Sequence, residues 1–176
     1  MVRWADRLGQ LGPVTTFDYP YVQRGNRAPD RLPKLLIAHR AQLDALHPST
    51  DDPVVLIGKS MGSRVGCHLA NDTDAAGVIC LGYPLRTLKG SMRDEVLLSM
   101  TTPILFVQGT RDRLCPLDLL DTVRNQMTAS NFVHVVQEGD HSLAITKRHT
   151  KATGETQQDS DDAVFAAIRS FVTQLR

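Results

Sequence analysis

Three polar residues have the types and the order along the chain that nucleophilic catalysis by serine requires. Ser60 stands in the run GKSMG at positions 58–62, which fits the pattern Gly-x-Ser-x-Gly. Asp112 and His141 follow it, in the order serine, acid, histidine. A serine hydroxyl is a weak nucleophile at neutral pH, so it needs a histidine base, whose tautomer a carboxylate must hold. The three residues are therefore the candidate catalytic set, and acyl transfer is the chemistry that they predict.

The residues around the serine predict a sharp corner between a strand and a helix. The apolar run Val54–Ile57 leads into the motif, and a helical pattern over residues 63–71 leads out of it. Strand, tight turn and helix are the context of a nucleophile elbow. Side chains at Gly58 and Gly62 are expected to collide with neighbouring backbone, which accounts for both glycines. The elbow would hold the Ser60 Oγ above the sheet edge, at a helix N-terminus that favours negative charge.

Two other glycine-rich motifs overlap the same residues, and neither fits. A phosphate-binding P-loop needs a glycine five residues before Gly58, where the sequence has Pro53. A dinucleotide fingerprint needs its second glycine where Ser60 stands. An incidental strand-to-helix corner is the remaining alternative, because Gly-x-Ser-x-Gly by itself is a weak signal.

The elements that must position these residues alternate between strands and helices. Helical patterns separate five segments that are predicted to be strands: 14–17, 54–57, 78–81, 104–107 and 132–136. Three of these segments are continuous apolar runs, as expected for strands covered on both faces. The sequence predicts an α/β fold, with a doubly wound, mostly parallel sheet of about five strands and helices on both faces. We expect one compact domain over residues 1–176, without a lid.

The placement of the acid and the histidine supports the elbow. Ligands of such sheets bind beyond the carboxyl ends of the strands. Asp112 comes shortly after the strand predicted to end at Val107, and His141 comes shortly after the one predicted to end at Val136. Asp140 is an alternative acid, and His68 is a weak alternative base.

The predicted reaction divides the work among these groups. His141 would take the proton of Ser60 and later return it to the leaving group, while Asp112 stabilises the imidazolium. The backbone N–H of Met61 would donate to the oxyanion. Water would then hydrolyse the acyl-enzyme. The residues expected to line the acyl pocket follow the third predicted strand: Tyr83, Pro84 and Leu85.

Two further expectations concern the C-terminal third of the chain. The stretch from Thr146 to Asp161 is polar and is expected to be a mobile surface segment. An apolar stripe from Val164 to Leu175 predicts a C-terminal helix, with Ser160 as its N-cap.

The composition favours a cytoplasmic globular protein without a cofactor or a metal. The 176 residues are 41% hydrophobic and 22% charged, with a formal net charge of +1, so nothing favours nucleic acid or an anionic membrane as a partner. The N-terminus lacks the apolar core of a signal peptide. An odd, sparse set of cysteines predicts reduced thiols, and no Cys/His cluster has zinc-ligand spacing: Cys67, Cys80 and Cys115.

Taken together, the runs TFDYPY, LIGKSMGSRV, VICLGYPL, FVQGTRD and GDHS resemble a particular group of α/β-hydrolases. This group comprises testis-expressed protein 30 and the hydrolase-like domain of NSL-complex subunit 3, and it is related more loosely to the dienelactone hydrolases. The resemblance covers essentially the whole chain and implies Ser60, Asp112 and His141 as the triad. Dienelactone hydrolases use a cysteine nucleophile, whereas this chain has Ser60.

The resemblance also suggests a difference at the N-terminus. The family normally begins with a further strand, whose His-Gly-type turn supplies the second oxyanion donor. The sequence starts at the helix that would follow it, so we expect the strand to be absent and turnover to be slow. The sheet edge left unpaired would then favour a homo-oligomer.

Two classes of function follow from these observations. The first is a serine esterase or thioesterase that acts on a small-molecule ester. The second is a catalytically weak or inactive interaction module on a hydrolase scaffold. A complete set of Ser60, Asp112 and His141 favours the first, and the expected loss of a strand favours the second.

Overall fold

The computed structural model describes residues 2–46 and 53–175. The chain forms two compact units, Met1–Pro53 and Val54–Arg176. All of the candidate catalytic residues lie in the second unit. The expectation of one domain over the whole chain stays a prediction.

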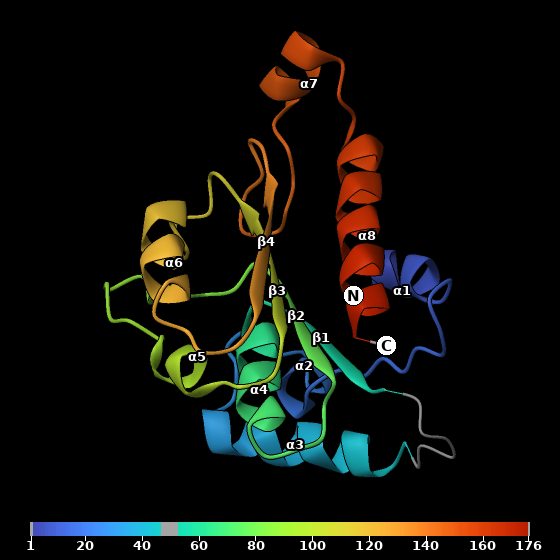
Figure 1. Cartoon of the computed structure of the whole chain (residues 1–176), viewed down its shortest axis with the longest axis vertical. Helices are drawn as coiled ribbons and strands as arrows, with labels where there is room; N and C mark the ends of the chain where they lie inside the picture. Colours follow the sequence, from blue (N-terminus) through green and yellow to red (C-terminus); the bar gives the residue numbers. More distant parts are fainter. Residues whose placement is uncertain (1, 47–52, 176) are drawn as a thin grey trace. The chain divides into compact units, whose positions relative to one another are not determined.

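A parallel sheet forms the centre of the second unit (Figure 1). In the part of the chain that the structure describes, the sheet has four strands in the order β1-β2-β3-β4: β1 (Val55–Lys59), β2 (Gly77–Leu81), β3 (Ile104–Gly109) and β4 (Asn131–Val136). Every residue of β2 and β3 is buried, as their continuous apolar runs predict for central strands. All the pairings are parallel, so the carboxyl ends of the strands share one edge of the sheet.

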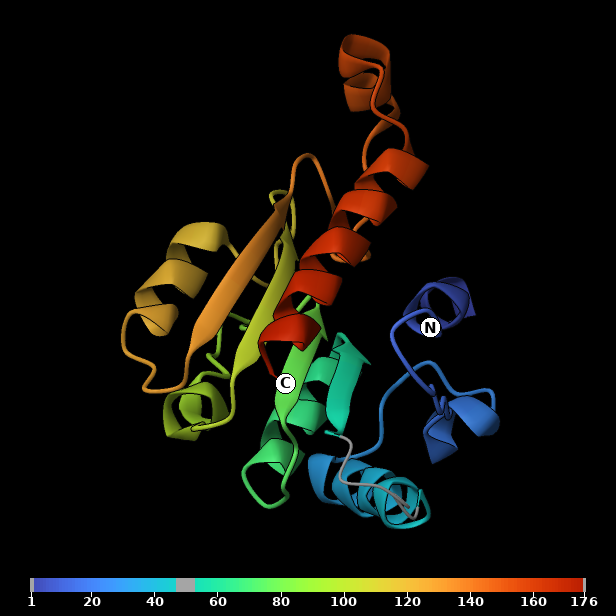
Figure 2. The same cartoon turned by 45° about the vertical axis from the view of Figure 1, so that its right-hand side comes forward.

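Helices cover both faces of this sheet (Figure 2). They are α4 (Met61–Ala70), α5 (Glu95–Ser99), α6 (Leu117–Arg124) and α8 (Gln157–Gln174). The strands are joined in sequential order by crossovers of one hand, so α4, α5 and α6 lie on one face. The long helix α8 lies on the other face and contacts β3 and β4, whereas α4 contacts β1 and β2. The doubly wound architecture is therefore confirmed.

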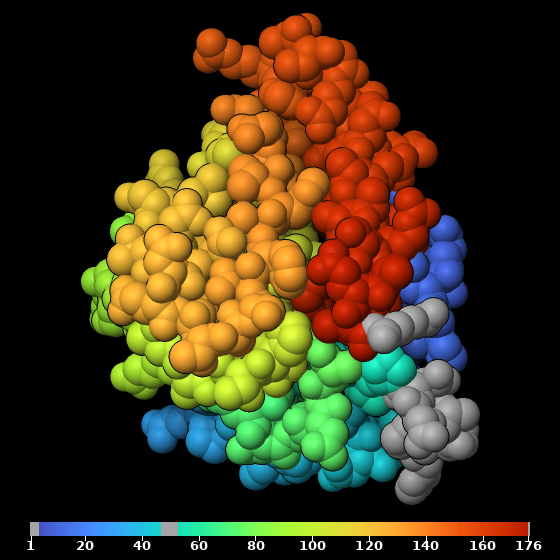
Figure 3. Space-filling model, viewed as in Figure 1, coloured from blue at the N-terminus to red at the C-terminus, as the bar shows by residue number. Residues whose placement is uncertain are grey.

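The polar stretch before α8 is more ordered than its composition predicts. It contains α7 (Lys147–Thr153), which begins after Thr146 and ends at Gly154 in a left-handed conformation. In the space-filling view, α7 forms the outer tip of this unit beyond α8 (Figure 3). The prediction of Ser160 as the N-cap of the last helix was wrong. Thr156 caps α8 instead, because its hydroxyl and the Asp159 carboxylate form a reciprocal capping box.

The first unit contains α1 (Val2–Leu8), α2 (Pro20–Gln23) and α3 (Leu32–Asp44). Residues 14–17 form no strand, and this prediction was wrong. Val14 is 41% exposed, and among the described residues no strand pairs with this segment. A short segment with β-forming residues becomes a strand only where a neighbour accepts its backbone hydrogen bonds, and a local pattern cannot provide that neighbour.

An aromatic cluster holds a neutral histidine in the first unit. The His39 ring lies 4.9 Å from the Phe17 ring, centroid to centroid, and a hydrogen bond of 3.1 Å joins the Tyr19 hydroxyl and His39 Nδ1. Burial lowers the pKa of His39 from 6.5 to about 4. The folded chain therefore keeps this imidazole uncharged at neutral pH.

This histidine predicts a loss of stability in mild acid. Between about pH 6.5 and pH 4 the unfolded chain binds a proton that folded His39 does not, so the free energy of unfolding falls as the pH falls. The pKa difference corresponds to an upper limit of about 3 kcal/mol. We expect a smaller loss, because the ring is only half-buried and solvent screens its charge. Urea unfolding of the wild type and of His39→Phe across this range measures it. Equal pH slopes for the two proteins would refute the assignment to His39.

Candidate active site

The serine stands at a strained corner between β1 and α4. Ser60 has φ 52° and ψ −114°, a conformation that side-chain-bearing residues rarely adopt and that is typical of functional sites. Its N–H donates to the Leu81 carbonyl over 3.1 Å, which ties the corner to β2. A Cβ atom on Gly58 would lie 2.2 Å from the carbonyl carbon of Gly62, so only glycine fits at position 58. The geometry is that of a nucleophile elbow.

The second glycine of the motif, Gly62, is not required by a collision of this kind. A Cβ atom on Gly62 would meet no atom within 4 Å outside the neighbouring helical backbone. The expected collision at Gly62 was therefore wrong. It is the Gly62 backbone, on the first turn of α4, that leaves no room for a side chain at Gly58. Met61 is the first residue of α4, where a backbone N–H has no partner within the helix.

The structure brings the three candidate catalytic residues together in one hydrogen-bonded chain. Ser60 Oγ lies 2.8 Å from His141 Nε2, and His141 Nδ1 lies 2.7 Å from Asp112 Oδ2. The Asp112 side chain is fully buried, whereas the His141 side chain is 28% exposed. The carboxylate is thus shielded from water, while the imidazole faces both the serine and the solvent.

A buried glutamine that the sequence analysis missed orients the acid. Gln108, fully buried at the end of β3, accepts a hydrogen bond from the Tyr83 N–H through Oε1 (3.1 Å). Its Nε2 must then face the other way, where it donates to Asp112 Oδ2. The Leu114 N–H donates to the other carboxylate oxygen, over 2.8 Å. One feature of the sequence could have indicated this role: Gln108 directly follows the apolar run of a central strand, where a polar side chain is buried and needs hydrogen-bond partners.

Two further glycines make room for the loop that carries the histidine. A Cβ atom on Gly109 would lie 2.2 Å from the Gly139 carbonyl oxygen, and one on Gly82 would lie 2.6 Å from the His141 carbonyl oxygen. Gly82 also has φ 67°, in the left-handed region. The loops after β2 and β3 therefore approach the His141 loop as closely as backbone can, and they set the height of the imidazole above the sheet.

The match to a known family covers nearly all of the chain. A model of the alpha/beta hydrolase domain matches residues 1–173. The chain belongs to the α/β-hydrolase family.

Solved structures of other α/β-hydrolases share the fold. A serine hydrolase homologue from Coxiella burnetii has a TM-score of 0.67 at 20% identity, over 98% of this chain and 74% of that one. A monoacylglycerol lipase from Paleococcus ferrophilus has a TM-score of 0.71 at 11% identity, over 99% and 90%. The esterase domain of a Rhodothermus marinus protein has a TM-score of 0.55 at 15% identity, over 78% of this chain and 69% of that one. At these identities the similarity shows the fold.

Other side chains of this α/β-hydrolase that could have served as acid or base do something else. Asp140 shapes the histidine loop, because its Oδ1 accepts from the N–H groups of Ser142 and Ala144. His68 lies two turns along α4 from the serine. His134 lies within β4, where burial lowers its pKa. Neither histidine takes part in the hydrogen-bonded chain from Ser60 to Asp112.

The cysteines of this α/β-hydrolase are free thiols in the core. Cys67 and Cys80 lie with their sulfurs 3.6 Å apart, and Cys115 is also fully buried. Burial raises the pKa of the Cys115 thiol to about 12. A buried thiol of this kind is a poor nucleophile, so Ser60 has no competitor among these cysteines. Within the described residues, no group of three His, Cys, Asp or Glu side chains gathers as a metal site would require.

The residues expected to line the acyl pocket are enclosed. Tyr83, Pro84 and Leu85 are buried, and the Tyr83 hydroxyl donates to the Arg93 carbonyl over 2.8 Å. The Tyr83 ring packs edge-on against Phe106, with the centroids 6.1 Å apart. A role in acyl binding stays a prediction for these residues.

The same substitution to alanine is expected to have very different effects on stability at the two elbow glycines. Gly58→Ala forces a Cβ into the Gly62 backbone, so we expect the free energy of unfolding to fall by about 3 kcal/mol. Gly62→Ala meets open space in a helix, so stability should stay within about 1 kcal/mol of wild type. Thermal and urea unfolding of the matched pair measure both changes. A Gly62→Ala variant as unstable as Gly58→Ala would contradict the one-sided requirement.

Proposed function

We propose that the chain is a serine hydrolase that cleaves a small acyl ester or thioester through an acyl-enzyme on Ser60. The observation that carries the proposal is the continuous chain from Ser60 Oγ to His141 Nε2, and from His141 Nδ1 to Asp112. A scaffold that only binds partners has no need of three groups in this geometry. Membership of the α/β-hydrolase family, with esterases and a lipase among its structural neighbours, supports the same reaction class.

The proposed first half-reaction transfers the acyl group to the serine. His141 Nε2 takes the hydroxyl proton as Ser60 Oγ forms a bond to the substrate carbonyl carbon, and the carbonyl π electrons move onto oxygen. The tetrahedral oxyanion then collapses, the bond to the leaving alcohol or thiol breaks, and His141 delivers its proton to that group. The products of this half-reaction are the acyl-enzyme and the free alcohol or thiol.

The second half-reaction repeats the same steps with water as the nucleophile. Throughout, Asp112 stabilises the imidazolium that forms when His141 is protonated. The buried Gln108 amide keeps the Asp112 carboxylate turned toward His141 Nδ1. Proton transfer thus occurs without reorientation of the acid or the base.

The oxyanion needs donors where its charge develops. The Met61 N–H, on the first turn of α4 beside Ser60, is the proposed first donor. Slow turnover for want of the usual second donor stays a prediction, and the loss of one donor typically costs about 10²–10³ in rate.

Labelling with a fluorophosphonate probe, followed by intact-mass measurement, tests the proposal without knowledge of the substrate. We expect a single covalent adduct on the wild type and on Ser142→Ala, an exposed serine whose hydroxyl accepts from Lys59 Nζ. Ser60→Ala should take no label. A wild-type protein that stays unlabelled would support the alternative of an inactive interaction module, and a labelled Ser60→Ala would place the nucleophile elsewhere.

We also propose a closer kinship within the family, with testis-expressed protein 30 and the hydrolase-like domain of NSL-complex subunit 3. The runs around Ser60, Asp112 and His141 support this placement.

A further inference from the structure

A small pocket beside α4 gathers positive charge away from the serine. It has a volume of about 80 Å³ and is lined by Arg64, His68, Met92, Arg93, Glu95 and Val96. All of these residues belong to the unit Val54–Arg176. Arg64 and His68 are four residues apart on α4, so they lie one turn apart on the same side of the helix. Ser60 stands a further turn away, about 6 Å along the helix axis from Arg64.

The basic side chains of this pocket lack hydrogen-bond partners. Among the described residues, Arg64 Nε and His68 Nε2 are buried side-chain nitrogens that make no hydrogen bond. An unpaired buried donor costs about 1–3 kcal/mol, more for a charged group, so native structures normally provide it with an acceptor. The Arg64 Nε–H group therefore lacks an acceptor, which a bound group that accepts hydrogen bonds would supply.

Arg93 is presented to the pocket by a fixed backbone. Its N–H donates to the Leu85 carbonyl over 2.8 Å, and its carbonyl accepts from the Tyr83 hydroxyl over 2.8 Å. Burial and the positive charge of Arg64 lower the pKa of Arg93. The two like charges line the same pocket and repel each other, a repulsion that a bound anion would relieve.

Glu95, the acidic residue of the lining, does not neutralise its two arginines. Glu95 is exposed, and no ion pair within 4 Å joins it to Arg64 or Arg93 in the described part of the chain. Burial, followed by the charge of Arg64, lowers the pKa of His68, while Asp72 and Glu95 act in the opposite direction. With His68 neutral, the two arginines and Glu95 leave the lining with one net positive charge.

We propose that this pocket binds a phosphate group, held by Arg64 and Arg93 and by the imidazole of His68. Guanidinium groups match the oxygens of phosphate, which offers more acceptor oxygens than a carboxylate to the two guanidinium groups and the imidazole that line this pocket. The volume is far below the roughly 300 Å³ at which pockets for larger ligands begin, so the pocket takes one such group. The group is either free phosphate or the terminus of a phosphomonoester.

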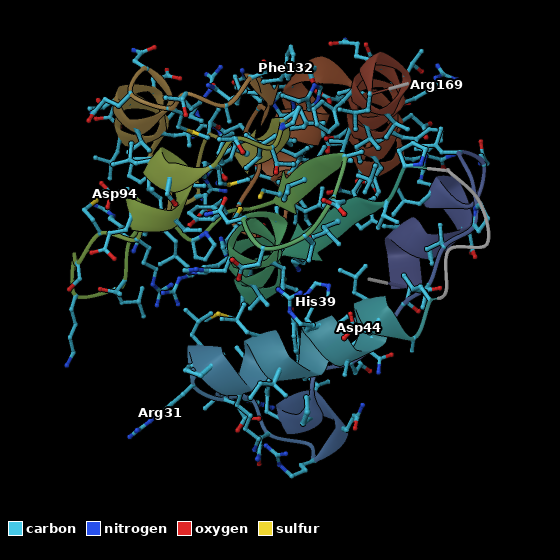
Figure 4. The ribbon with its side chains drawn as sticks, turned by 60° about the horizontal axis from the view of Figure 1, so that its bottom comes forward. Arg31, His39, Asp44, Asp94, Phe132 and Arg169 are labelled. Atoms are coloured by element: carbon cyan, nitrogen blue, oxygen red, sulfur yellow. The ribbon has the colours of Figure 1, made fainter. Side chains whose placement is uncertain are left out.

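Calorimetric titration with inorganic phosphate at constant ionic strength tests the proposal. We expect one saturable site on the wild type, and binding at least tenfold weaker in Arg64→Gln and in Arg93→Gln. The matched control is Arg169→Gln, on α8, on the opposite side of the unit from Asp94, the neighbour of Arg93 (Figure 4). Ser60→Ala should bind phosphate as the wild type does, which separates this site from the proposed hydrolase function.

Histidine NMR of the wild type gives a second readout that needs no folded variant. Bound phosphate should raise the pKa of His68, because a nearby anion favours the charged imidazole. The resonances of His134, within β4, should not move.

Two further titrations complete the test. Glycerol phosphate identifies the source of the phosphate group, and acetate shows whether the pocket prefers phosphate to a carboxylate. Glycerol phosphate that binds as well as phosphate would identify the terminus of a larger ligand, and binding of phosphate alone would identify the free ion. The proposal is overturned by absence of a saturable site, by equal weakening in Arg169→Gln, by acetate binding as tightly as phosphate, or by an unmoved His68.

Discussion

Replacing Ser60 with alanine is expected to lower the turnover of a short p-nitrophenyl ester by up to about 10⁶-fold, the loss typical of removing the nucleophile from such a set. The physical reason is that the hydroxyl is the atom that forms the acyl-enzyme, and no neighbouring group can replace it. Cys115, the nearest alternative by chemistry, is buried with its pKa raised to about 12. Stopped or continuous assays of p-nitrophenolate release measure the change.

A second serine substitution provides the matched control for this prediction. Ser142 lies beside His141 in the sequence and is exposed, and its hydroxyl accepts from Lys59 Nζ over 3.1 Å. We expect Ser142→Ala to keep turnover within about tenfold of wild type, because the hydroxyl is outside the chain that moves the proton. Turnover by Ser60→Ala close to that of wild type would exclude Ser60 as the nucleophile.

Asp112→Asn is expected to lower turnover by about 10⁴-fold, with the protein still folded. An amide at this position removes the charge that stabilises the imidazolium. It also offers an N–H group to His141 Nδ1, which would then act as acceptor, so that Nε2 would carry the proton and could no longer act as the base. Steady-state kinetics measure the loss, and circular dichroism checks the fold.

The surroundings of Asp112 add a stability cost to this variant. Leu114 N–H donates to one carboxylate oxygen and Gln108 Nε2 donates to the other. Whichever way an asparagine amide turns, its NH₂ group meets a donor, which should cost about 1–3 kcal/mol.

Asp140→Asn is the control for the choice of acid. Its Oδ1 can still accept from Ser142 and Ala144 after the substitution, so we expect less than a tenfold loss of turnover. If Asp140→Asn instead lost as much as Asp112→Asn, the assignment of the acid to the loop after β3 would be wrong.

Sequence patterns predicted the strands that carry the candidate site and the residue types of its chemistry. Continuous apolar runs are enough to identify buried parallel strands, because a strand covered on both faces has no polar side. The positions of Ser60, Asp112 and His141 after such strands predicted that they meet at one edge of the sheet. The hydrogen bonds between them confirm that expectation. Local patterns sufficed there because strand ends and their order along the chain largely specify the topology.

Features that depend on what lies opposite a residue could not be read from local patterns. Residues 14–17 have a strand-like composition but no pairing neighbour. Gly58 and Gly62 look equivalent in the motif, yet only the Cβ position of Gly58 is filled by backbone. Gln108 appears as one polar residue at a strand end until its amide is seen between Tyr83 and Asp112.

The phosphate pocket has the same physical origin. Arg64 and His68 are ordinary helix residues in the sequence, and Arg93 is 25 positions further than His68 along the chain. Their side chains come together only because α5 and the segment before it pack beside α4, where Asn71 Nδ2 donates to Ser99 Oγ over 2.9 Å. Sequence patterns report periodicity and order along the chain. Close approach between distant segments is set by packing, which brings Gln108 to Asp112 and forms the pocket beside α4.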